Sequence, residues 1–162
     1  MSSLIAIDPG TRSTGIAKFL NGQLVQAYTL KSYSKDINTR MRAIVEDHGR
    51  SGHFADRVVL EIPHVHGRKV DPNKALIPLA IIGGALWARS SIYSEPPELI
   101  MATASQWKGS LGKPTCHARG RMRLKIDEIS IWAKSASDDE RDAICLGLWA
   151  VGRFGPQRVI AR

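Results

Sequence analysis

The turn signal Asn21-Gly22 constrains the fold of this chain more than any other short stretch. It separates two strand-like runs, "GIAKFL" at 15–20 and "QLVQAYTL" at 23–30, and Asn-Gly between such runs is typical of a tight β-hairpin. The run "LIAID" at 4–8 precedes them and ends before a Pro-Gly pair. The chain is therefore expected to open with two or three antiparallel strands.

Helices and strands alternate after this opening. Apolar spacing and turn residues predict, in chain order, a helix at 37–50, a strand at 57–62, a long helix at about 73–90, a strand at 98–102, a short helix at 103–109, a loop at 109–120, a helix at 119–134 and a last helix from 137. Pro78 is expected to interrupt the long helix. The helix at 119–134 rests on an apolar stripe formed by Met122, Ile126, Ile129 and Trp132. This order indicates an α/β domain around one mixed sheet.

The composition narrows the class of protein. The 162 residues are 43% hydrophobic, which suits one globular domain over 1–162, with the last few residues as a flexible basic tail. The apolar run at 75–88 contains a proline and two glycines and is too short to span a membrane, and no signal peptide opens the chain. Cys116 and Cys145 offer neither a disulfide framework nor a paired metal-thiolate spacing. We expect a protein of the reducing cytosol.

The charge is strongly positive and unevenly spread. The formal net charge is +8 and the pI is near 9.9. Between residues 103 and 136, seven cations stand against two acids; the cations are Lys108, Lys113, Arg119, Arg121, Arg123, Lys125 and Lys134. A polyanionic partner, nucleic acid first, is the leading explanation, and a soluble face that is basic by chance is the other.

The acids at the start of the last helix are of two kinds. Ser137 followed three residues later by Glu140 predicts a helix start, where acids are favoured by the helix dipole without any catalytic role. Asp142 differs, because its neighbours three, four and seven residues on are apolar. A buried carboxylate requires a cation or a metal as partner. Asp138 and Asp139 lie on the same face one turn earlier.

Two more acids occupy unusual positions. Asp8 ends the first apolar run, and Glu61 interrupts "VVLEI" inside an expected central strand. Together with the helix acids they predict one carboxylate cluster at one end of the sheet, which stays ionised only around divalent cations. Oxygen ligands without Cys or His spacing suit Mg²⁺ or Mn²⁺ rather than zinc. On a basic protein this set indicates two-metal phosphodiester chemistry, although a single strand-end Asp is more often a turn former.

Three segments, "LIAIDPGTRSTGIAKF", "VVLEIPH" and "DDERDAICLGLWA", resemble in order and spacing the motifs of RuvC-like Holliday junction resolvases, part of the RNase H-like nuclease superfamily. The similarity covers nearly the whole chain, and the short length is similar to that of phage-type members. It implies an RNase H-like single domain, with a mixed central β-sheet flanked by α-helices. The matching acids, implied to be both catalytic and metal-binding with two Mg²⁺ ions that Mn²⁺ can replace, are Asp8, Glu61, Asp139 and Asp142. Asp138 is one residue off this register and stays a supporting or helix-start charge.

The resemblance also implies a cytoplasmic homodimer, acting in the host cytoplasm if phage-encoded. It would bind a four-way DNA junction, without any membrane, and make paired symmetric nicks that leave 5′-phosphates. The residues expected to contact DNA are His64, Arg68, Lys69, Lys108, Lys113, Arg119, Arg121 and Arg123, and those expected in the dimer interface are Leu79, Ile82, Gly83 and Leu86. Many family members carry a stacking aromatic where this chain has His64. Its role stays open, and a metal pair with His66 is less favoured.

Three competing interpretations use the same residues. "DPGTRSTG" also resembles the first phosphate loop of actin-like and sugar-kinase ATPases, but that fold needs two such domains, which 162 residues cannot supply. A catalytically dead junction-binding protein would keep the basic segment and lose the acids. A ribonuclease acting on RNA–DNA hybrids shares the metal chemistry, but Glu61 on its strand and the glycine-containing long helix favour the resolvase.

Overall fold

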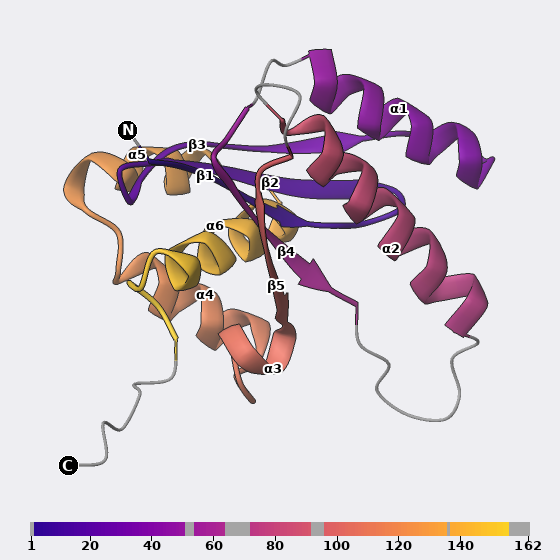
Figure 1. Cartoon of the computed structure of the whole chain (residues 1–162). Helices are drawn as coiled ribbons and strands as arrows, with labels where there is room; N and C mark the ends of the chain where they lie inside the picture. Colours follow the sequence, from indigo (N-terminus) through magenta and orange to yellow (C-terminus); the bar gives the residue numbers. More distant parts are fainter. Residues whose placement is uncertain (1, 51–53, 64–71, 92–95, 136, 156–162) are drawn as a thin grey trace.

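A computed structural model shows one five-stranded sheet with helices on both faces (Figure 1). It describes residues 2–50, 54–63, 72–91, 96–135 and 137–155. The strands are β1 (Ser3–Asp8), β2 (Ser13–Leu20), β3 (Gln23–Lys31), β4 (Arg57–Ile62) and β5 (Glu98–Thr103). The helices are α1 (Ile37–Arg50), α2 (Pro72–Arg89), α3 (Ala104–Trp107), α4 (Lys113–Arg121), α5 (Ile129–Lys134) and α6 (Asp138–Ala150), with a 3₁₀ turn, η1 (Ile126–Glu128).

The sheet is mixed, as predicted. Its order is β3-β2-β1-β4-β5, with β1, β2 and β3 antiparallel and with β1, β4 and β5 parallel. Asn21 and Gly22 both have positive φ, 51° and 76°, which matches the right-handed twist of the strands that they join. The hairpin prediction is therefore confirmed.

Successive residues of β1 enter two different cores. Ile5 and Ile7 pack beneath α1 and α2, and Leu4 and Ala6 pack beneath α6, because side chains alternate across a strand. Figure 1 shows α1 and α2 on one side of the sheet, with α6 on the other and α3 and α4 next to it. The sheet thus separates two apolar layers, and α6 covers the side on which the basic segment lies.

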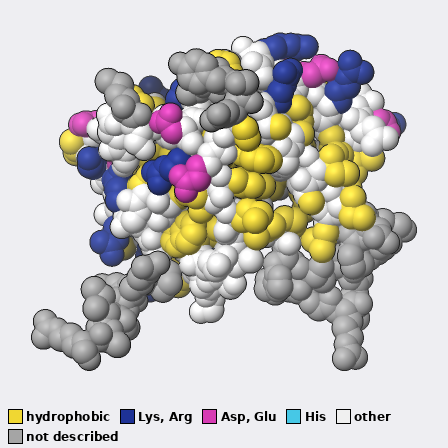
Figure 2. Space-filling view, viewed as in Figure 1, with side chains coloured by type: hydrophobic (Ala, Val, Ile, Leu, Met, Phe, Trp, Pro, Cys, Tyr) yellow, Lys and Arg dark blue, Asp and Glu magenta, His cyan; other side chains and the backbone are white. Residues whose placement is uncertain are grey.

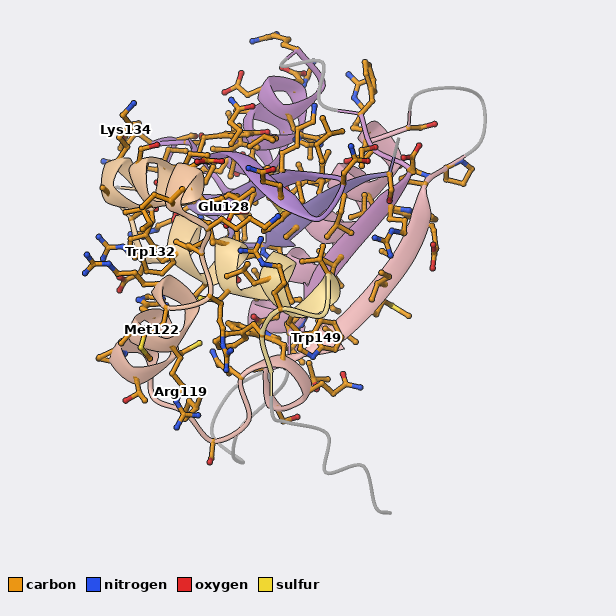
Figure 3. The ribbon with its side chains drawn as sticks, turned by 90° about the vertical axis from the view of Figure 1, so that its left-hand side faces the viewer. Arg119, Met122, Glu128, Trp132, Lys134 and Trp149 are labelled. Carbon is orange, nitrogen blue, oxygen red and sulfur yellow. The ribbon has the colours of Figure 1, made fainter. Side chains whose placement is uncertain are left out.

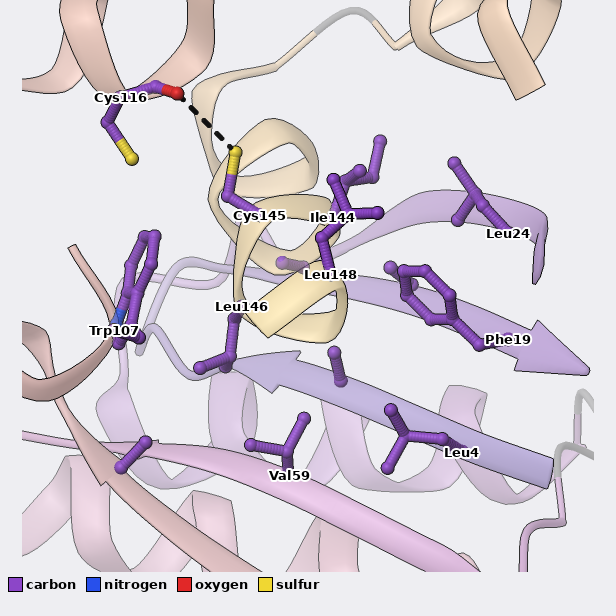
Figure 4. Packing of buried hydrophobic residues seen from close by; sticks show 14 of the residues in the cluster. Leu4, Phe19, Leu24, Val59, Trp107, Cys116, Ile144, Cys145, Leu146 and Leu148 are labelled. Atoms are coloured by element: carbon purple, nitrogen blue, oxygen red, sulfur yellow. Dashed lines mark hydrogen bonds between the residues drawn. The ribbon is translucent and has the colours of Figure 1, made fainter. Parts of the chain in front are cut away.

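The core beneath α6 fixes this helix on the sheet. Leu146 points from α6 toward Val59 on β4, Phe19 packs from β2, and Trp107 closes one end (Figure 4). All four side chains are completely buried. Each contributes roughly 1.5–3 kcal/mol through removal of apolar area from water. The first turn of α6, with its acids, is therefore held at a defined place on the sheet.

The predicted loop at 109–120 is wrong over most of its length, because α4 begins at Lys113. Pro114 lies in the first turn of the helix, where its missing N–H is not needed for a backbone hydrogen bond. Pro114, which the sequence analysis placed in a loop, instead lies at the start of a helix.

The single helix predicted at 119–134 is also wrong. The chain leaves the helix after Arg121 and re-enters it only at η1 and α5. Met122, Ile126 and Ile129 are exposed, at 76%, 81% and 37%, and only Trp132 of the predicted stripe is buried. The apolar spacing of this segment therefore does not describe a core face.

Glu128 explains why the segment bends. Its fully buried carboxylate accepts hydrogen bonds from the backbone N–H of Leu24 and Lys125 at 2.7 and 2.6 Å, and from the guanidinium of Arg153 at 2.7 and 2.6 Å. Burial works against its charged form, but these hydrogen bonds lower the pKa of Glu128. This cluster ties the β2–β3 hairpin, the basic segment and the end of α6 together (Glu128 is labelled in Figure 3).

The long helix α2 runs through Pro78 without a break and is buried on one face. Ile82 and Leu86, predicted to face a second subunit, are fully buried against the chain's own sheet. A Cβ at Gly83 would lie 3.0 Å from Leu60, so this close approach is also internal. These three interface predictions are corrected, because the apolar spacing of α2 packs on its own sheet. Leu79 is half-buried.

The outer face of α2 carries other apolar residues. Ile77 and Ile81 are exposed at 50% and 56%, and Met101 on β5 is exposed at 58%. Figure 2 shows hydrophobic side chains in a broad band across the face on which α2 and β5 lie. Among the described residues, no helix is long and apolar enough to cross a membrane.

Candidate active site

The four predicted acids come from two adjacent strands and the first turns of α6. β1 and β4 run parallel with Ile7 opposite Leu60, so Asp8 and Glu61, the next residue on each strand, reach the same level of the sheet edge. Asp139 and Asp142 lie one turn apart on α6. All three other acids act electrostatically on Asp8. The structure thus brings together the carboxylates that the sequence singled out.

A glycine lets α6 approach the strands so closely. Gly15 on β2 pairs with Asp8, and a Cβ at this position would lie only 1.9 Å from the carbonyl oxygen of Asp139. Next to it, the hydroxyl of Ser13 donates a short hydrogen bond to the Asp139 carboxylate. β2 therefore sets the position of Asp139 in two ways. The lack of a side chain at Gly15 leaves room for α6, and the Ser13 hydroxyl binds the Asp139 carboxylate.

The start of α6 separates structural acids from site acids. The Ser137 side chain accepts a hydrogen bond from the Glu140 backbone N–H at 3.1 Å, which confirms it as the N-cap. The Glu140 carboxylate accepts from the Thr29 hydroxyl at 2.7 Å and stabilises the helix on β3. Asp138 is 61% exposed, whereas Asp142 is 5% exposed. Asp138 therefore lies at the exposed rim, where its carboxylate is 3.9 Å from the Nδ1 of His117.

Burial and neighbouring negative charge raise the pKa values of Asp8 and Glu61. Burial raises the pKa of Asp8 well above its usual range, the charges of Glu61, Asp142 and Asp139 raise it further, and Lys113 lowers it. Burial also raises the pKa of Glu61, against the lowering effects of Lys108 and a hydrogen bond from Trp107. The site therefore favours added positive charge.

Lys113 and His117, one turn apart on α4, both contact Asp142. The Lys113 ammonium and the His117 Nε2 each lie 2.8 Å from its carboxylate oxygens. Burial disfavours the charged Lys113, but Asp142, Asp8 and Asp138 together raise the pKa of Lys113. Lys113 was predicted as a DNA contact, and its side chain is 50% exposed at the edge of the site.

His117, Trp107 and Ser13 belong to the site and were missed by the sequence analysis. The Trp107 Nε1–H donates to the Glu61 carboxylate at 2.9 Å, although Trp107 is fully buried. The spacing of Lys113 and His117 would have indicated a shared helix face, had a helix been expected there. Nothing in the sequence pairs Trp107 with Glu61.

A basic cavity of about 740 Å³ adjoins the carboxylates through Trp107 and Lys108. Arg119, Met122 and Arg123 line it, with Leu111, Phe154 and the loop between α3 and α4. The Lys108 ammonium lies 5.0 Å from the centre of the Trp107 ring. Figure 3 shows Arg119 and Met122 together at the end of α4.

The predicted DNA contacts thus divide into four groups. Lys108 and Lys113 act electrostatically on the carboxylates, and Arg119 and Arg123 line the adjoining cavity. Arg121 is exposed and is not among the residues that line this cavity. The remaining predicted contacts, His64, Arg68 and Lys69, lie outside the described residues.

The carboxylate oxygens of the four site acids are the kind of ligand that a hard cation prefers. Their present positions would have to change before they could bind one. Within the described residues, no three His, Cys, Asp or Glu side chains are grouped so as to hold a metal ion as they stand. Lys113 and His117 occupy both oxygens of Asp142. The four site acids offer only carboxylate oxygens, which Mg²⁺ prefers. Rotation of these side chains, with release of Lys113, would open Asp142 to a cation.

Comparison with known proteins identifies the fold of this chain. No protein-family model matches the chain, and no curated protein matches it. Solved structures do: RuvC of Thermus thermophilus in complex with a Holliday junction substrate has a TM-score of 0.69 at 17% identity, covering 96% of this chain and 99% of that one. Fowlpox virus resolvase in complex with Holliday junction DNA has a TM-score of 0.57 at 19% identity, covering 93% and 97%. The yeast mitochondrial Holliday junction resolvase Ydc2 has a TM-score of 0.56 at 11% identity, covering 94% and 80%. This chain therefore has the RNase H-like fold of RuvC and of other Holliday junction resolvases.

Proposed function

We propose that this protein is a metal-dependent DNA endonuclease that resolves four-way junctions by paired symmetric nicks leaving 5′-phosphates. The observation that carries the proposal is the cluster of four carboxylates around Asp8, held on a scaffold with the fold of junction resolvases and bordered by cations. The junction complexes of the Thermus and fowlpox enzymes support the choice of substrate.

In this proposal Asp8, Glu61, Asp139 and Asp142 hold two Mg²⁺ ions, which Mn²⁺ can replace. When bound, such ions activate a water molecule and stabilise the leaving oxygen of the phosphodiester. The residues of this chain position the parts. Trp107 orients Glu61 through its N–H, and Ser13 orients Asp139 through its hydroxyl.

Lys113 has two possible anionic partners in this scheme. Its half-exposed ammonium neutralises Asp142 while no phosphate is present. Once a DNA strand approaches, the same ammonium can contact a phosphate, as can Lys108, Arg119 and Arg123 along the adjoining cavity. Binding of the polyanion thereby frees a carboxylate that the metal needs.

A homodimer follows from the two-fold symmetry of the substrate, since paired symmetric nicks require two active sites. We place the interface on the exposed band of α2 that includes Ile77 and Ile81. Ile81→Asp is expected to convert a dimer into monomers in light scattering. Val25→Asp, at an exposed position of β3, is the matched control and leaves the mass unchanged. A wild type that is monomeric at micromolar concentration contradicts the dimer.

The test of the function is a substrate panel with Mg²⁺. Immobile four-way junction, linear duplex of the same sequence and RNA–DNA hybrid are incubated with the wild type, and the nicked strands are mapped. We expect symmetric nicks in the junction and intact duplex and hybrid. Cleavage of the hybrid while the junction stays intact would indicate a ribonuclease rather than a resolvase. Binding of the junction without any cleavage would indicate a junction-binding protein.

A further inference from the structure

A second basic cavity borders the carboxylate cluster on the β2 side. It has a volume of about 570 Å³ and lies between the start of β2 and the β3–α1 connection, where Arg12, Ser13, Lys31, Tyr33, Lys35 and Arg40 line it. Ser13 also donates to the Asp139 carboxylate, so one residue belongs to both the cavity and the catalytic cluster. A strand whose phosphate lies at the carboxylates can extend into this cavity.

Tyr33 is an unusual residue to find here, because its side chain is 90% exposed. An aromatic ring in water contributes nothing to the core, and four cations line the same cavity while its described lining includes no acid. Exposed aromatic rings next to Lys and Arg are the arrangement on which unstacked bases bind, since every base has a face that can stack and every nucleotide carries a phosphate.

The connection that carries Tyr33 is fixed by Arg40. This guanidinium donates to the carbonyl oxygens of Thr11, Ser34 and Lys35 at 3.1, 2.8 and 2.8 Å. The carbonyl of Ser34 belongs to the residue next to Tyr33. The ring is therefore displayed on a braced backbone, and little conformational entropy is lost when a ligand binds to it.

The charge of this connection is open to an anion. Its one acid in residues 31–40, Asp36, accepts hydrogen bonds from the backbone N–H and the hydroxyl of Thr39, both at 2.7 Å, at the start of α1. Arg12, Lys31 and Lys35 are exposed. The exposed side chains that line the cavity are thus a ring and three cations, and the exposed carboxylate of Asp36 lies beside them at the start of α1.

We propose that this cavity, the Tyr33 cavity, binds one unstacked nucleotide of the DNA strand beside the scissile phosphate. The base stacks on Tyr33, and the phosphate contacts Arg12, Lys31 and Lys35. The volume suits one nucleotide with solvent. The inference rests on the proposed nuclease function and adds a substrate subsite to it. It assigns to Tyr33 a base-stacking role separate from that predicted for His64.

The test compares two substitutions at Tyr33. Affinity for a four-way junction is measured in EDTA, and kcat/KM for its cleavage is measured in Mg²⁺. Tyr33→Ala is expected to weaken both by about tenfold, because it removes the ring, and Tyr33→Phe is expected to stay within about twofold of the wild type. Val25→Ala, at an exposed apolar residue of β3, is the matched control. All variants should melt like the wild type, since neither side chain is buried.

A second measurement locates the base. Junctions with one abasic nucleotide, placed in turn at each of the two positions on either side of the nick, are bound by the wild type and by Tyr33→Ala. At one position the missing base should weaken binding to the wild type about tenfold and leave binding to Tyr33→Ala unchanged.

The outcomes separate this inference from the proposed function. If the wild type does not cut the junction, the nuclease proposal fails first. If the wild type cuts and Tyr33→Ala cuts and binds equally well, the stacking role is overturned while the nuclease proposal stands. A Tyr33→Phe variant as weak as Tyr33→Ala, or an abasic effect that Tyr33→Ala retains, overturns it too.

Discussion

Replacing Gly15 by alanine tests how β2 positions the catalytic acids. The added methyl would lie 1.9 Å from the carbonyl oxygen of Asp139 and 2.4 Å from its carbonyl carbon. A carbon and a carbonyl oxygen approach to about 3.3 Å, so the first turn of α6 must move by about 1.4 Å or more. Asp139 and Asp142 would move with it, away from Asp8 on the paired strand.

The magnitude follows from this displacement. Overpacking of a core contact costs about 1–3 kcal/mol, which lowers the melting temperature of a chain of this size by about 3–10 °C. A misplacement of about 1 Å in a catalytic constellation lowers the rate by about 100-fold. Gly15→Ala is therefore expected to lose about two orders of magnitude in junction cleavage while remaining folded at 25 °C.

The assay uses an exposed position away from the site as control. Val25 on β3 is 44% exposed and lies outside both the carboxylate cluster and the proposed dimer face, so Val25→Ala should leave cleavage unchanged. Melting is followed by circular dichroism, and kcat/KM is measured with a four-way junction. Cleavage by Gly15→Ala within threefold of the wild type would refute the argument that the close approach of β2 and α6 sets the site.

Further predictions concern the charged groups. Asp8→Asn should abolish cleavage. It should also raise the melting temperature of the metal-free protein at pH 7 by about 2–4 °C, since it removes roughly 1 kcal/mol of repulsion from the neighbouring acids. An unchanged or lower melting temperature contradicts this. Because the pKa values of Asp8 and Glu61 are raised, protons compete with cations above the usual carboxyl range, and the Mg²⁺ concentration for half-maximal cleavage should fall as pH rises from 5 to 8; a flat dependence contradicts this. Arg153→Met leaves Glu128 buried without its guanidinium and should cost about 3–5 kcal/mol in urea unfolding, whereas a loss below about 1 kcal/mol would show that the backbone donors suffice.

The sequence predicted what short-range chemistry determines. Asn21-Gly22 specified the hairpin because its backbone geometry belongs to the two residues themselves. Asp142 indicated a functional site, because a carboxylate on an apolar helix face needs a cation or a metal as partner. The convergence of Asp8 with Glu61 followed from two strand ends meeting at one edge of the sheet.

The remaining features depend on contacts between distant parts of the chain. Trp107 binds Glu61, and Glu128 binds Arg153, across separations that no local pattern records. Apolar periodicity also gave a wrong helix prediction where an apolar residue lies on the surface, as Met122 does beside the basic cavity. A helix as apolar as α2 does not reveal which face meets its own sheet.

The central claim is that Asp8, Glu61, Asp139 and Asp142 form the catalytic metal site, and neighbouring acids on α6 test it most directly. Mg²⁺-dependent cleavage of a four-way junction is measured for Asp139→Asn, Asp142→Asn and the exposed control Asp138→Asn. The account predicts a loss of about 1,000-fold or more for the two site variants, in line with removal of essential catalytic groups, and a change within about threefold for Asp138→Asn. Site variants that cut as well as the wild type, or a control that is as inactive as they are, would contradict it.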